Sequence, residues 1–95
     1  MAAYIIADVD VTDSVLFDEY RKQVGPTIEK YGGKYLVRGG TTEAVEGGWS
    51  PKRLVILEFE SLERAREWYH SPDYSGPKDL RHKSAKTNVT IVEGL

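Results

Sequence analysis

The chain has 95 residues, of which 40% are hydrophobic and 29% are charged, a composition typical of one small globular domain covering residues 1–95. Its 13 basic and 15 acidic residues are well mixed and leave a net charge of −2, so no basic block favours a nucleic-acid partner. There is no cysteine, which excludes disulfide scaffolds, thiolate zinc sites and cysteine nucleophiles.

The N-terminal segment predicts a strand and not a targeting signal. Residues 3–11 alternate between two faces, with Ile5, Ala7 and Val9 on one of them. The segment has no basic region and no long apolar stretch. We therefore expect no signal peptide, no membrane partner and a cytoplasmic location.

A helix is predicted from the polar turn at residues 12–14 to about Tyr31, because apolar side chains recur every three or four residues. Gly25-Pro26 predicts a kink or a restart within it, since proline removes a backbone donor. Glycines 32–33 are expected to end this helix.

The remaining predicted elements follow in chain order. A short strand is predicted at 34–38, and residues 41–45 are expected to extend it past a bulge. A loop at 46–51 and the strongest strand, at 52–59, come next. Then come a helix capped by Ser61 and ended by Ser71-Pro72, a loop with a short helix at 73–85, and a final strand at 87–93.

This order, β-α-β-β-α-β, predicts an α+β ferredoxin-like domain, with a four-stranded antiparallel sheet beneath two helices. The runs 4–7 and 54–57 are apolar without alternation, which indicates strands buried on both faces. One face would lie under the helices. We expect a second copy to cover the other, giving a homodimer packed sheet to sheet, a dimeric α/β barrel with a chamber. That open face would carry Tyr4, Ile6, Leu54, Ile56, Val89 and Ile91.

The first candidate site consists of Asp8, Asp10, Arg38 and Glu58. Strand alternation places Asp8 and Glu58 on the face of the predicted chamber. A carboxyl group against apolar walls keeps its proton more readily and can act as a general base on a small acidic substrate. Arg38 could hold a substrate carboxylate through two contacts. Alternatively, both carboxylates form salt bridges with Arg38 or Arg53 at the rim and hold the dimer together.

Several short motifs, in this order and spacing, resemble the domain-of-unknown-function family 1330 of the dimeric α/β-barrel superfamily. The resemblance covers nearly the whole chain and implies a ferredoxin-like fold and a homodimeric barrel. Related families include cofactor-independent monooxygenases, isomerases of small acidic metabolites and heme enzymes, so the resemblance implies no single reaction. The motifs are Tyr31-Gly32-Gly33-Lys34-Tyr35-Leu36-Val37-Arg38-Gly39-Gly40, Glu46-Gly47, Ala65 with Trp68-Tyr69, Ser71-Pro72 with Tyr74, Arg81, and Ile91-Val92-Glu93-Gly94.

The second candidate site contains Tyr74 and Arg81, two positions that look characteristic of the resembled family. The resemblance implies that Arg81 anchors an anion and that Tyr74 donates a hydrogen bond beside it, in a segment able to close over a pocket. Alternatively, Arg81 caps carbonyl groups and Tyr74 packs on the helix that contains Trp68. Trp68 and Tyr20 are expected either to pack in the core or to line the same pocket.

No metal or cofactor site is predicted. His70 and His82 are separated by twelve positions and lack the spacing of metal ligands. Asp8 and Asp10 could chelate a hard cation only weakly. The glycine pairs do not form a phosphate-binding loop.

Three functions are compatible with these patterns. The first is a cofactor-independent enzyme that acts on a small carboxylated or enolisable metabolite. In that enzyme Arg38 and Arg81 would bind the anion, Asp8 or Glu58 would move a proton, and Tyr74 would polarise an oxygen. The second is a non-catalytic dimer that binds a small ligand, and the third is a structural dimer whose chamber is filled by side chains.

Overall fold

The computed structural model describes residues 1–95 and contains four strands and three helices. No helix is both long and apolar enough to cross a membrane. In chain order the elements are β1 (Ala3–Val11), α1 (Ser14–Lys30), β2 (Lys34–Arg38), β3 (Leu54–Phe59), α2 (Leu62–Tyr69), α3 (Pro72–Ser84) and β4 (Ala85–Glu93).

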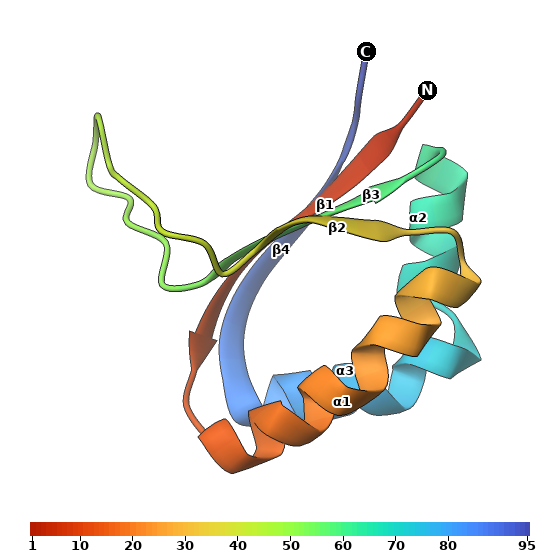
Figure 1. Ribbon diagram of the computed structural model, residues 1–95, viewed down its shortest axis with the longest axis horizontal. Coiled ribbons are helices and arrows are strands. Elements are labelled where there is room, and N and C mark those ends of the chain that lie inside the picture. The colour runs from red at the N-terminus through yellow and green to blue at the C-terminus, as the bar shows by residue number, and fades with distance from the viewer.

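The strands form one antiparallel sheet in the order β2-β3-β1-β4. All three helices lie on the same side of this curved sheet, and the other side carries no helix (Figure 1). This is the predicted ferredoxin-like arrangement, since the two central strands, β1 and β3, are flanked by β4 and β2. The fold prediction is therefore confirmed, with one helix more than expected.

The additional helix is α3, where the sequence had predicted a loop with a short helix. Ser71 and Pro72 end α2 but also begin α3. The Ser71 hydroxyl accepts a hydrogen bond from the Tyr74 amide at 3.2 Å, and Pro72 occupies the first turn, where its missing N–H is not needed. The same dipeptide thus stops one helix and starts the next.

Two further expectations differ from the structure. Helix α1 is continuous through Gly25-Pro26 to Lys30, which excludes the restart, one of the two outcomes expected there. Residues 41–45 form no strand, because they have no partner beside β2. Instead, residues 39–53 make a long loop that extends away from the sheet on the side opposite the helices (Figure 1).

The prediction for the two faces of the sheet is right for β1 and β3 but wrong for β4. Ile6 pairs with Ile56, and both side chains lie on the face without helices. Val89 pairs with Ala7 and Ile91 with Ile5, so Val89 and Ile91 face the helices instead. Alternation along a strand shows which of its residues share a face, but it does not show which of the two faces is buried. For β4 the buried face follows only from its register with β1.

The core lies between the helix face of the sheet and the three helices. Its centre is a group of aromatic rings in which Trp68 stacks on Tyr74, with ring centroids 4.0 Å apart, and lies 5.6 Å from Phe59. The Trp68 indole N–H donates to the Thr27 hydroxyl at 3.0 Å, so the polar atom of this buried ring is paired. These contacts tie α2 and α3 to α1 and to β3.

Gly33, just before β2, allows the close approach of α1 and β3. A Cβ atom at this position would lie 2.6 Å from the Phe59 ring and 2.8 Å from the Ile28 side chain. We expect Gly33→Ala to lower the free energy of unfolding by about 1–3 kcal/mol, because overpacking forces these side chains to move. Urea denaturation measures this change.

Gly48→Ala is the matched control, since a Cβ at Gly48 meets nothing within 4 Å. It should leave the urea midpoint nearly unchanged. Equal effects of the two substitutions would contradict the packing described for Gly33.

Candidate functional site

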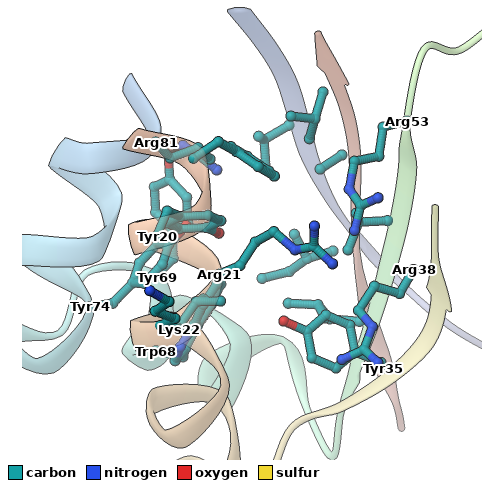
Figure 2. Close-up of a pocket in the computed structure, with 18 of the residues that line it drawn as sticks. Tyr20, Arg21, Lys22, Tyr35, Arg38, Arg53, Trp68, Tyr69, Tyr74 and Arg81 are labelled. Carbon is teal, nitrogen blue, oxygen red and sulfur yellow. Dashed lines mark hydrogen bonds between the residues drawn. The ribbon is translucent and has the colours of Figure 1, made fainter. Parts of the chain in front are cut away.

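A cavity of about 420 Å³ lies between the helix face of the sheet and the helices. Of its 19 lining residues, 13 are hydrophobic, so most of its wall suits an apolar ligand body. Side chains enter it from α1 and α3 on one side and from the sheet on the other (Figure 2). The remaining lining groups are mainly basic: Arg21, Lys22, Arg38, Arg53 and Arg81.

Arg81, on α3, is the most unusual of these basic groups because it is only 4% exposed. One terminal nitrogen lies 3.2 Å from His82 Nε2 and 3.5 Å from the Tyr69 hydroxyl, whereas its buried Nε has no hydrogen-bond partner. No carboxylate lies within 4.0 Å of this guanidinium, since it takes part in none of the six ion pairs. A guanidinium stays charged at any physiological pH. The cavity wall therefore holds a desolvated positive charge that has no carboxylate partner and whose Nε lacks an acceptor.

Arg38 and Arg53 bring positive charge to the sheet side of the cavity. The guanidinium of Arg38 lies over the Tyr35 ring, 4.8 Å from its centroid. Arg53 precedes β3, and its buried Nε also lacks a hydrogen-bond partner. Neither arginine pairs with a carboxylate. The cavity is thus positively charged although the whole chain has a net charge of −2.

Three tyrosines place hydroxyl groups around the same cavity. The Tyr20 and Tyr74 hydroxyls are 3.1 Å apart and share a hydrogen bond. Burial raises the pKa of Tyr20 well above its ordinary value, and it also raises the pKa of Tyr74 although nearby Arg81 opposes the shift. Burial likewise raises the pKa of Tyr35, against the opposing charge of Arg38. All three hydroxyls stay protonated at neutral pH. Because either Tyr20 or Tyr74 donates its one proton to the other, one hydroxyl of that pair and the Tyr35 hydroxyl remain able to donate to an anion.

The structure brings together five of the seven predicted site residues. Arg81, Tyr74 and Trp68 enter the cavity from the two C-terminal helices, Tyr20 enters from α1, and Arg38 enters from β2. Trp68 and Tyr74 are each buried in the core and also form part of the cavity wall, so packing and lining are not exclusive alternatives. The role of Tyr74 as a hydrogen-bond donor to an anion stays a prediction.

Asp8 and Glu58 do not join this group. Both lie on the face without helices, where Glu58 pairs with Lys34 at 3.1 Å. Asp8 accepts hydrogen bonds from the Trp49 indole at 2.9 Å and from the Lys52 amide at 3.1 Å. The prediction that they share a face is right, but within one subunit Arg38 lies on the opposite face. The suggested rim salt bridges with Arg38 or Arg53 do not form within the subunit either.

Tyr35 and Arg53 also belong to the cavity wall, although neither was predicted as a cavity residue. Tyr35 and Arg38 both pair with helix-face residues of β3, Leu57 and Val55, so the alternation along β2 could have revealed Tyr35. The register shift between Tyr35 and Val37 is what keeps Tyr35 and Arg38 on one face, although they are three positions apart. Arg53 lies just before β3, which begins at Leu54 and not at residue 52 as predicted, but alternation along the predicted strand already places Arg53 on the face of Val55 and Leu57.

No cluster of three or more histidine, aspartate or glutamate side chains is arranged to hold a metal ion. His82 is exposed and contacts the cavity only through Arg81. His70 is the residue that caps the C-terminus of α2, where its backbone amide donates to the Arg66 carbonyl at 3.0 Å.

Residues 2–95 match the protein family described as a domain of unknown function, DUF1330. The chain belongs to this family. The resemblance inferred from the glycine-rich centre and the C-terminal motifs is therefore confirmed. No curated protein sequence matches the chain.

Solved structures with similar folds include proteins of known and unknown function. A protein of unknown function from Rhodopseudomonas palustris is 18% identical, with a TM-score of 0.78 over 99% of this chain and 82% of that one. SnoaB from Streptomyces nogalater, described as a cofactor-independent oxygenase, is 6% identical, with a TM-score of 0.68 over 99% and 93%. A dimeric protein of unknown function with a ferredoxin-like fold from Bacteroides fragilis is 10% identical, with a TM-score of 0.64 over 98% and 96%. At these identities the likeness shows the fold alone.

The tyrosines of the cavity give the protein a characteristic alkaline titration. We expect Tyr20, Tyr35 and Tyr74 to ionise above the ordinary tyrosine pKa of 10.0, which ultraviolet absorbance at alkaline pH measures. Because their pKa values are raised in the folded state, the associated stability is complete below about pH 10 and is lost as the pH rises further. Tyr20→Phe should remove one late-ionising group. Six tyrosines titrating together in the folded protein would contradict the burial described here.

Proposed function

We propose that the protein is a homodimer that binds a small organic anion with an apolar body in the cavity of each subunit. The observation that carries this proposal is Arg81, which is 4% exposed, has an unpartnered Nε and lies in the wall of a mostly apolar cavity. A ligand carboxylate or enolate would supply the acceptor that the protein does not. Its apolar part would cover the aliphatic and aromatic wall.

The same groups can also favour a chemical step on an enolisable carbonyl compound. When the α-carbon loses a proton to water at the cavity mouth, the electron pair of the C–H bond moves onto the carbonyl oxygen and an enolate forms. The Arg81 guanidinium and whichever hydroxyl of the Tyr20–Tyr74 pair keeps its proton free would stabilise this oxygen more strongly than the ground-state carbonyl. Asp18 is the only carboxylate in the cavity wall, and it lies 3.8 Å from Arg21. The proposed rate enhancement therefore comes from stabilising the enolate and not from a protein base. Asp8 and Glu58 have no step in it.

Binding without catalysis is the second candidate, and the lack of a base directed into the cavity favours it. Phenylpyruvate distinguishes the two functions, because its methylene protons exchange with deuterium only when the enol or enolate forms. An enzyme of the proposed kind accelerates this exchange in an NMR time course. A protein that binds phenylpyruvate without accelerating exchange is a ligand-binding dimer.

The homodimer is proposed because the helix-free face of the sheet is apolar. Tyr4, Ile6, Leu54 and Ile56 lie there half-buried in one subunit, and exposed Val92 extends the patch on β4. A contiguous apolar surface of this kind is typical of an interface. A second copy, packed sheet to sheet, would cover it, and the Bacteroides fragilis protein of similar fold is described as dimeric.

Ile56→Asp tests the dimer. We expect it to raise the dissociation constant at least a hundredfold, because an uncompensated buried charge costs about 3–5 kcal/mol. Size-exclusion chromatography with light scattering measures the mass. Val15→Asp is the control, since Val15 on α1 is 75% exposed and lies away from this face. A dimer of Ile56→Asp as tight as that of the parent would exclude sheet-to-sheet packing.

Arg81→Met tests the anion site. Methionine retains most of the apolar length of arginine, and loss of a buried unpaired charge need not destabilise the fold. We expect the affinity for 2-naphthoate, measured by calorimetry, to fall at least tenfold, because hydrogen bonds to charged groups contribute about 1.5–3 kcal/mol.

Two controls accompany this variant. Arg66→Met removes an exposed arginine of α2 and should leave 2-naphthoate binding unchanged. The neutral isostere 2-naphthamide should bind the parent protein weakly and Arg81→Met about equally. Undiminished 2-naphthoate binding by a folded Arg81→Met protein would rule out the proposed anchor.

A further inference from the structure

We infer that the ligand of this cavity carries two anionic groups joined by an apolar segment, and that Arg53 binds the second of them. This inference rests on the proposed function, since it assumes that Arg81 binds the first anion. Two buried side-chain atoms of the protein lack a hydrogen-bond partner, Nε of Arg53 and Nε of Arg81. Both belong to guanidinium groups that line the same cavity.

The position of Arg53 is fixed by its surroundings. Its carbonyl oxygen accepts a hydrogen bond from the Val9 amide at 2.9 Å, which holds the residue at the end of the sheet. Its guanidinium packs directly on Gly39, where a Cβ atom would lie 2.9 Å from Arg53 Cζ. Gly39 also has a φ of +72°, a conformation that suits glycine. The Phe17 ring lies on another side, with its centroid 6.0 Å from Cζ.

Arg53 and Arg81 reach the cavity from opposing walls. Arg53 extends from the sheet side and Arg81 from α3 on the helix side (Figure 2). Most of the remaining wall of the cavity is apolar and includes Val9, Phe17 and Val55. A ligand that satisfies both guanidinium groups must therefore present an anion at each end and apolar atoms between them.

The charge balance supports the same class of ligand. A monoanion can pair with one arginine but leaves the Nε of the other buried and without an acceptor. A dianion offsets both charges and also relieves their mutual repulsion. Arg21 and Lys22 are not needed for this arrangement, because Asp18 and Glu19 already lie beside them at 3.8 and 3.3 Å. Linear or aromatic dicarboxylates have the required chemistry.

A chain-length series tests the inference on the unaltered protein. The probes are the linear dicarboxylates from succinate to sebacate and the monomethyl ester of each, which has similar length and one charge fewer. Calorimetry should give an optimum at one chain length, where the diacid binds at least about tenfold more tightly than its own monoester. Affinity that rises steadily with length and is equal for diacid and monoester would overturn the inference.

Two variants assign the ends of the ligand. Arg53→Met should abolish the advantage of the best diacid over its monoester while changing monoester affinity by less than about threefold. Arg81→Met should weaken both compounds. If Arg53→Met weakens the monoester as much as Arg81→Met does, a single carboxylate bridges both arginines and the inference fails.

The two proposals fail in different ways. If neither 2-naphthoate nor any diacid binds the parent protein, the proposed anion site is wrong and the inference falls with it. If 2-naphthoate binds and depends on Arg81, but no diacid exceeds its monoester, only the second anion site is wrong. Arg66→Met serves again as the matched control, and the chain-length series does not depend on the folding of any variant.

Discussion

β1 runs through the middle of the sheet and pairs along its length with β3 and β4, so every second side chain of β1 faces the helices. Ala3, Ile5, Ala7 and Val9 are all buried on that side. The intervening side chains meet no helix. The alternation along β1 thus gives the molecule one side with the core and the cavity and another side with an apolar surface. A register shift of β1 by one residue would move each of its side chains to the opposite side.

The cavity side combines features that oppose stability. A mostly apolar cavity of about 420 Å³ lowers the packing that the core could achieve, and a buried guanidinium with no carboxylate partner and an unpaired Nε adds a desolvation cost. Proteins commonly keep such destabilising arrangements where a ligand supplies the missing partner. Helices α1 and α3, joined by the hydrogen bond between Tyr20 and Tyr74, hold these groups in place without filling the space.

The sequence was sufficient for the element order, because apolar periodicity and caps such as Ser61 act locally. It was also sufficient to select Arg81, Tyr74, Tyr20, Trp68 and Arg38, all of which line the cavity. It failed where the outcome depends on distant pairing. The face of Val89 and Ile91, for example, is fixed by their pairing with β1. Asp8 and Glu58 were assigned to the correct face, but the cavity lies on the other one.

The two tryptophans lie on opposite sides of this division. Trp68 is 2% exposed and stacks on Tyr74 in the cavity wall, whereas Trp49 is 62% exposed and its indole N–H bonds Asp8 on the helix-free face. Their intrinsic fluorescence therefore forms a natural pair of optical reporters. Emission from Trp68 senses the interior where a ligand would lie, and emission from Trp49 senses the surface where a second subunit would pack. With one of them replaced, the chain reports on either event separately without an attached dye.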